Sequence, residues 1–159
     1  MSKPGSRAIV IAYDGSEPAR GAIEAAAETL EHGTKAYVAT IWEPLNALPF
    51  WGAPVGAVPQ DLLDNVENQA EKVAAEGAEA ATAAGFDAEA VVEEGNPVWR
   101  SIIKIAEKHD AGLIVIGSHG RTGLSYVLAG SVATAVMQHA PCSVMVLCNR
   151  TRNRQEGRQ

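Results

Sequence analysis

Short apolar runs alternate with longer stretches of helical periodicity along this chain. The first run, residues 8–13, is continuously apolar, which is typical of a strand buried on both faces of a parallel sheet. It stops at residues 14–16, where Ser16 is suited to cap a helix. Alanine and isoleucine at helical spacing then predict a helix over residues 17–31, which ends at His32 and Gly33.

A second strand and a longer helix follow. Residues 36–42 read as a strand, and residues 43–60 contain four prolines, which predicts an irregular loop. From residue 61 to residue 84, apolar or small residues form one helical stripe, with most of the acidic residues off it. The stripe consists of Leu62, Val66, Ala70, Val73, Gly77, Ala81 and Ala84. This pattern predicts a long helix that packs along one side and ends at Gly85.

The alternation continues to residue 147. Strands are predicted over residues 88–92, 113–116 and 143–147, and helices over residues 98–108 and around 132–139. Regular alternation of strand and helix is typical of an α/β fold with parallel strands and right-handed crossovers. We therefore expect a five-stranded, doubly wound parallel sheet between two layers of helices.

Length and composition agree with one ordinary domain. The chain has 159 residues, of which 47% are hydrophobic and 20% charged. These values argue against a disordered chain or a membrane protein, and no apolar run reaches the roughly 18 residues that suggest a bilayer span. We expect a single domain over residues 1–148, a cytoplasmic location and no membrane insertion.

Charge is unevenly distributed. The last eleven residues, 149–159, hold four arginines and one glutamate, so they carry +3 and leave −9 on residues 1–148 out of the total of −6. We expect a basic, flexible tail on an acidic body. The acidic body counts against nucleic acid as a partner.

The two cysteines are too few for a disulfide framework. Cys142 and Cys148 also lack the spacing of a Cys-x-x-Cys metal site. We expect both thiols to be reduced and buried.

Candidate chemistry gathers after the first and fourth strands. In doubly wound sheets, ligands bind beyond the carboxyl ends of the strands, where the strand order reverses. Asp14 follows the first strand, and the glycine-rich segment 117–131 follows the fourth. Gly117 and Gly120 would let the backbone approach a phosphate chain, while Gly130 would precede the amides of a helix start. The pattern predicts an anion site built from main chain.

Several other site classes are excluded by their motifs. A P-loop needs a lysine that residues 109–159 lack, and the first strand leads into Asp14-Gly15-Ser16 in place of a dinucleotide-binding glycine motif. A phosphoacceptor receiver needs an aspartate after the third strand and a lysine after the fifth, and neither is present. No Gly-x-Ser-x-Gly hydrolase elbow occurs.

The segment instead carries Gly-x2-Gly-x9-Gly-Ser, formed by Gly117, Gly120, Gly130 and Ser131. In this motif, in Asp14 after the first strand and in Gly95-Asn96-Pro97 before the third helix, the chain resembles the ATP-binding subgroup of the universal stress protein family. This family lies among the adenine-nucleotide α-hydrolase-like, Rossmann-like folds, and the resemblance covers roughly residues 6–148.

The resemblance implies a nucleotide site. Adenine would lie near the backbone of Ala12 and Ile41, with Asp14 near the ribose or a bound Mg or Mn ion. The phosphates would rest on the backbone of Gly117, Gly120, Gly130, Ser131 and Val132. Arg121, the one cation of the motif segment, could contact a phosphate or lie in solvent.

The resemblance also implies a role. It predicts an ATP-binding regulatory or signalling protein of the stress response, with at most slow ATP hydrolysis or self-phosphorylation and no catalytic residues. The alternative is a partner-binding adaptor in which AMP or ATP is a structural ligand. A homodimer through the fifth strand is implied, along with a protein partner whose identity the sequence leaves open.

Three features of the sequence allow more than one interpretation. Asp14 could simply stabilise its own turn or cap the first helix. The glycines of residues 117–131 could serve tight turns and close helix packing. Trp42, Phe50 and Trp51 flank or lie in the proline-rich loop, and could form a lid over adenine, a partner surface or a local packing cluster.

Overall fold

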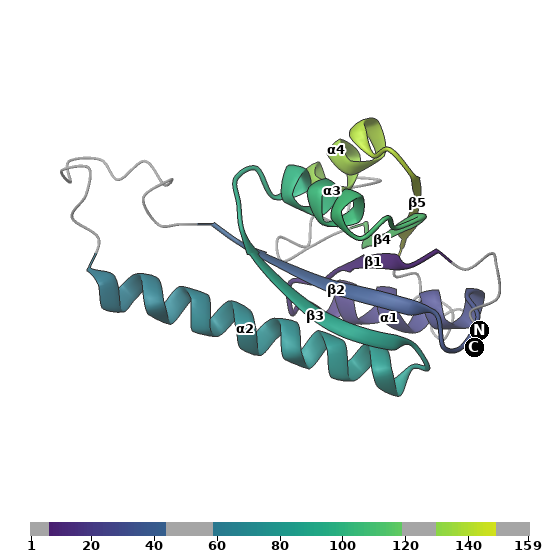
Figure 1. Ribbon diagram of the computed structural model, residues 1–159, viewed down its shortest axis with the longest axis horizontal. Helices are drawn as coiled ribbons and strands as arrows, with labels where there is room; N and C mark the ends of the chain where they lie inside the picture. The colour runs from purple at the N-terminus through teal and green to yellow at the C-terminus, as the bar shows by residue number, and fades with distance from the viewer. Residues whose placement is uncertain (1–6, 44–58, 119–129, 149–159) are drawn as a thin grey trace, which may run out of the picture.

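The computed structural model describes residues 7–43, 59–118 and 130–148. Strands and helices alternate along it, coloured from purple to yellow in Figure 1. The strands are β1 (Ile9–Ala12), β2 (Lys35–Trp42), β3 (Asp87–Glu94), β4 (Leu113–Gly117) and β5 (Ser143–Leu147), and the helices are α1 (Glu17–Thr29), α2 (Gln60–Ala83), α3 (Val98–Lys108) and α4 (Ser131–His139). The predicted basic tail and most of the proline-rich loop lie outside the described residues.

The strands form one parallel five-stranded sheet in the order β3-β2-β1-β4-β5. The chain first moves from the centre to one edge and then returns to fill the other side. Ile9 therefore lies between Ala36 of β2 and Leu113 of β4. The predicted doubly wound sheet is confirmed, and its strand order reverses between β1 and β4.

Helices cover both faces of the sheet. Side chains of β1 alternate: Ile9 and Ile11 pack with α1 and α2, while Val10 packs with α3 and α4. Figure 1 shows α3 and α4 together on one side and α1 and α2 on the other. Because Val10 and Ile11 are completely buried, burial on both faces explains why this strand reads as a continuous apolar run.

The ends of α1 and α2 follow local chemistry. The Ser16 side chain accepts a hydrogen bond from the Ala19 amide at 3.3 Å and begins α1, as predicted. The helix stops at Thr29, two residues earlier than expected. Beyond the end of α2, Gly85 has a φ of +109°, a conformation that favours glycine.

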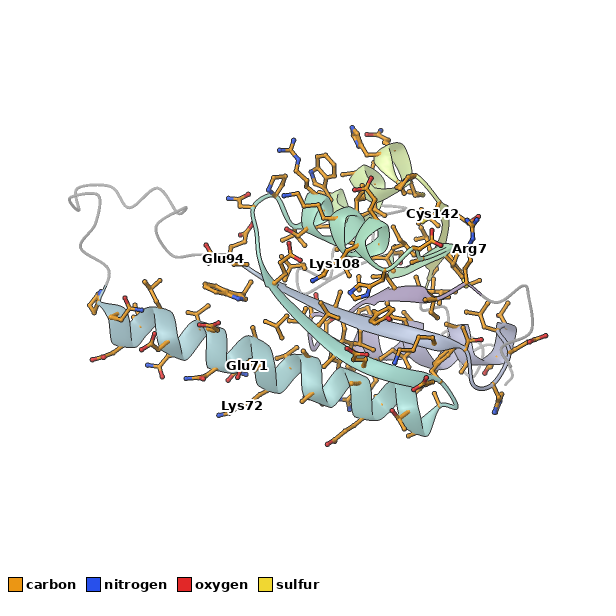
Figure 2. The ribbon with its side chains drawn as sticks, viewed as in Figure 1. Arg7, Glu71, Lys72, Glu94, Lys108 and Cys142 are labelled. Carbon is orange, nitrogen blue, oxygen red and sulfur yellow. The ribbon has the colours of Figure 1, made fainter. Side chains whose placement is uncertain are left out.

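Of the predicted apolar stripe on α2, only the central residues Ala70, Val73, Gly77 and Ala81 are buried. Val73 and Gly77 pack against the sheet, whereas Leu62 has 49% of its surface exposed. The first turns of α2, which include Leu62, extend past the carboxyl ends of β2 and β3 (Figure 1). On the outer side of the helix, Lys72 points away from the sheet into solvent (Figure 2).

Strand β3 is longer than predicted and is paired with β2 along its full length. It begins at Asp87 opposite Lys35 and ends at Glu94 opposite Trp42. The Lys35 ammonium lies 3.2 Å from Glu89 and 3.7 Å from Asp87. The hydrogen bond to Glu89 is the main reason that the pKa of Lys35 is raised. These two ion pairs are solvent-exposed and contribute little to stability.

The prediction that both cysteines are buried is wrong. Both thiols are free, but Cys148 is exposed just after β5 and Cys142 is half-buried before it (Figure 2). Partial burial raises the pKa of the Cys142 thiol. A strand at the sheet's edge covers its flanking residues on one side only, which explains the exposure.

Among the helices that the structure describes, none is at once long enough and apolar enough to cross a membrane. Helix α2 has the length, with 24 residues, but its outward side is charged.

Candidate nucleotide-binding site

A cavity of about 460 Å³ opens at the carboxyl ends of β1, β2 and β4. This is the place where the strand order reverses, and hence the expected place for a ligand in a sheet of this topology. Its walls come from these strand ends and from the first turns of α3 and α4.

Most of the predicted site residues lie together on this cavity. They are Ala12, Asp14, Ile41, Gly117, Gly130, Ser131 and Val132. Gly120 and Arg121, which were also predicted, lie outside the described residues. Residues from four separate stretches of the chain thus meet at one cavity.

The β1 side of the cavity is a turn held by a carboxylate. Asp14 lines the cavity, and its Oδ1 accepts a hydrogen bond from the Ser16 amide at 3.0 Å. Gly15 has a φ of +80°, which lets the chain turn sharply into α1. The local role considered for Asp14 is therefore present, and it coexists with a position on the cavity wall.

The α4 side of the cavity is built from main chain. Gly130 is the N-cap of α4, so this residue offers no side chain to occupy the amides of the helix's first turn. Its own amide donates to the Ser118 carbonyl at 2.5 Å, and the Ser118 amide donates to the Leu147 carbonyl at 2.9 Å. A Cβ on Gly130 would stand 3.2 Å from the Ser118 carbonyl oxygen. Glycine thus allows β4 and α4 to approach closely.

Several wall residues were not singled out from the sequence. They are Tyr13, Ala19, Ala39, Glu43, Val98, Ile102, Ile116 and Ser118. Glu43 could have been found, because it directly follows the second strand. Val98 and Ile102 could not, because only the packing of α3 against the sheet brings them to this edge.

The polar groups of the cavity fall into two sets. Two carboxylates, Asp14 and Glu43, come from the ends of β1 and β2, whereas Ser131 and Val132 bring the amides at the start of α4. Carboxylates accept hydrogen bonds, as from hydroxyl or amino groups, and helix N-terminal amides attract anions. Ala12, Ile41 and Val98 also line the cavity, and they offer apolar surface to a planar ring.

A metal centre made of protein ligands alone is not seen in the described part of the chain. No group of three or more histidine, cysteine, aspartate or glutamate side chains gathers there in a way that could hold an ion. A divalent ion at Asp14 would therefore need further ligands from a bound molecule, such as phosphate oxygens.

Comparison with known proteins matches the chain to one family model and to several curated relatives. The model of the universal stress protein family matches residues 5–147. A universal stress protein of Thermus aquaticus, encoded in the 3' region of the QAH/OAS sulfhydrylase, is 33% identical over 89% of this chain and 98% of its own length. Universal stress protein MJ0531 of Methanocaldococcus jannaschii is 32% identical over 87% of this chain and 80% of its own length.

Solved structures share the fold. Protein MJ0577 superposes with a TM-score of 0.76, at 22% identity, over 92% of this chain and 99% of its own. A universal stress protein in complex with cAMP gives a TM-score of 0.62, at 22% identity, over 90% and 97% of the two chains. One from Archaeoglobus fulgidus in complex with dAMP gives 0.58, at 23% identity, over 88% and 96%.

Proposed function

The chain belongs to the universal stress protein family, and on that premise we propose that it binds ATP in the cavity at the ends of β1, β2 and β4. Nucleotide occupancy would serve regulation or signalling in a stress response, with at most slow hydrolysis or self-phosphorylation. One observation carries the proposal: a single cavity is lined by two acidic residues, by apolar residues and by the N-terminus of a helix.

The two polar sets suggest how ATP lies. Phosphates fit the α4 side, where the amides of Ser131 and Val132 and the helix dipole favour negative charge. Adenine fits between Ala12 and Ile41, which leaves Asp14 near the ribose or near an ion that the phosphates also hold. The complexes of two structural neighbours with cAMP and dAMP support an adenine nucleotide as the ligand class.

Slow turnover at most is expected from the same arrangement. Hydrolysis needs a base that activates water at the terminal phosphate. Asp14 lies on the β1 side, already accepts the Ser16 amide, and in this proposal serves the ribose or a bound ion. We therefore expect bound ATP to stay unhydrolysed through many minutes, which would let occupancy by ATP serve as a signal.

The most direct test is mass analysis of the nucleotide released when the purified protein is denatured. ATP is the expected finding. AMP in its place would favour the adaptor with a structural nucleotide, and turnover of Mg-ATP many times per minute would contradict the regulatory role.

A paired substitution tests the site itself. Gly120→Ala together with Gly130→Ala should abolish co-purification of ATP while the protein stays folded, since a Cβ at Gly130 presses on the Ser118 carbonyl. Nucleotide retained by this variant would overturn the site assignment.

We also propose that the protein forms a homodimer through β5. This strand lies at one edge of the sheet, and its apolar residues, Val144 to Leu147, are all only half-buried. A second copy of the same strand would cover them and pair the open edge. Sedimentation should show a dimer at micromolar concentration, and a monomer there would contradict this proposal.

A further inference from the structure

Tyr13 lies between β1 and Asp14, and both its backbone amide and its backbone carbonyl make hydrogen bonds to β2. Its amide donates to the Ala39 carbonyl at 2.9 Å, which extends the β1–β2 pairing by one residue. Its carbonyl accepts the Thr40 hydroxyl at 2.9 Å in a buried hydrogen bond. Thr40 is only 6% exposed and does not line the cavity. The last peptide before Asp14 is therefore set by a side chain outside the site.

The Tyr13 ring is held as well. It is 2% exposed, and its hydroxyl donates to Glu76 Oε1 of α2 at 3.2 Å. Arg20 of α1 pairs with the same carboxylate oxygen. A hydrogen bond with the Tyr13 side chain is the main reason that the pKa of Arg20 is raised, and the nearby Glu76 carboxylate raises it further. A Cβ on Gly77 would lie 2.5 Å from the ring's Cδ1, so the ring packs directly against the backbone of α2 at this glycine.

We propose that Thr40 is a positioning residue for the nucleotide, acting through the Tyr13 carbonyl to hold the Asp14 carboxylate at the cavity. This inference rests on the proposed ATP site. Side chains of β2 alternate between the faces of the sheet, so Ala39 and Ile41 line the cavity while Thr40 lies on the α1 and α2 side. Its hydroxyl meets the Tyr13 carbonyl where the β1–β2 pairing ends.

The energetic reason is the burial of the accepting carbonyl. Without the Thr40 hydroxyl, the Tyr13 carbonyl would lose a buried partner, which favours rotation of the peptide that leads into Asp14. Rotation there moves the Asp14 carboxylate relative to the start of α4. Nucleotide affinity would fall even though no group that touches the nucleotide has changed.

A double-mutant cycle tests this. Mg-ATP affinity is measured by titration calorimetry for the wild type, Thr40→Val, Asp14→Asn and the double variant. We expect Thr40→Val and Asp14→Asn each to weaken binding about tenfold, and the double variant to match Asp14→Asn within about twofold. Thr40→Ser, which keeps the hydroxyl, should bind like the wild type.

Two results would overturn the inference while leaving the ATP site intact: wild-type affinity in Thr40→Val, or its full tenfold loss added to that of Asp14→Asn. Full addition would show that Thr40 affects binding independently of Asp14. Thr40→Ala removes the same hydroxyl and replaces Thr40→Val in the cycle if the valine variant does not fold. A wild type that binds no Mg-ATP would overturn the proposed function instead.

Discussion

The two sides of the cavity use opposite parts of the polypeptide. On the β1 and β2 side, Asp14 and Glu43 contribute carboxylate side chains, whereas on the α4 side the polar groups come largely from the backbone around Gly130 and Val132. Side-chain groups can be changed one atom at a time. Backbone amides can be changed only by moving the helix that carries them, so the two sides should respond differently to substitution.

The largest effect is expected where β4 and α4 approach most closely. Gly130→Val should weaken Mg-ATP binding by about a hundredfold or more, because its branched side chain must displace the Ser118 carbonyl or the start of α4. Calorimetric titration measures the loss, and far-ultraviolet circular dichroism checks that the fold is kept. Binding close to that of the wild type would show that the α4 amides do not hold the phosphates.

An effect of similar size, on the stability of the fold and not on binding, is expected at Gly77, which packs against Tyr13 on the β1 side of the cavity. Gly77→Ala should lower the free energy of unfolding by about 1–3 kcal/mol, because the new Cβ overlaps the Tyr13 ring. Urea denaturation measures this change.

A moderate effect is expected from the carboxylate of Asp14. Asp14→Asn keeps an oxygen that can accept the Ser16 amide, so the turn should persist while Mg-ATP affinity falls about tenfold. Repeating the titration with ATP and EDTA separates the two roles considered for this group. If the loss disappears without the divalent ion, Asp14 acts on the ion; if it persists, Asp14 acts on the ribose.

A smaller effect, on selectivity, is expected at Glu43. Its carboxylate can only accept hydrogen bonds, which suits the amino group of adenine and opposes the oxygen that inosine carries at the same position. Glu43→Gln should reduce the preference for ATP over ITP about threefold. Competition between the two nucleotides measures the ratio, and an unchanged preference would place Glu43 away from the base.

The smallest effect is expected at Ser131. Ser131→Ala removes a hydroxyl but keeps the amide at the start of α4, so Mg-ATP affinity should change by no more than about twofold to threefold. Titration under the conditions used for Gly130→Val compares the affinity losses of two substitutions at the start of the same helix. A loss as large as that of Gly130→Val would assign the phosphate contact to the side chain.

The sequence predicted the element order well because burial determines the pattern. β1 and β4 are buried on both faces and read as aliphatic runs, and α3 and β5 were predicted with the boundaries that the structure has. Leu62 was placed wrongly, because helical spacing does not indicate where the sheet beneath a helix ends. Only the strand order brings α2 alongside β3 and leaves its first turns beyond the sheet.

The candidate site divides in the same way. Asp14 and Gly130 follow from the rule that ligands bind at strand ends, which needs only the order of elements. Val98 and Ile102 reach the cavity by packing of α3, and the Thr40–Tyr13 contact depends on the register of β1 against β2. Register and packing arise from contacts between distant residues, which local periodicity does not report.

The pairing of β1 with β4 sets an order of events during synthesis. Ile9 and Leu113 are neighbours in the sheet although they stand 104 positions apart in the chain. While β4 and α4 are still inside the ribosome, the nascent chain already has Asp14 and Ile41 outside it. The helix N-terminus that completes the cavity is not yet present. Contacts so distant in sequence also form late when a chain folds. A ligand that contacts both sides of the cavity can therefore stabilise only the completed fold and not the incomplete chain.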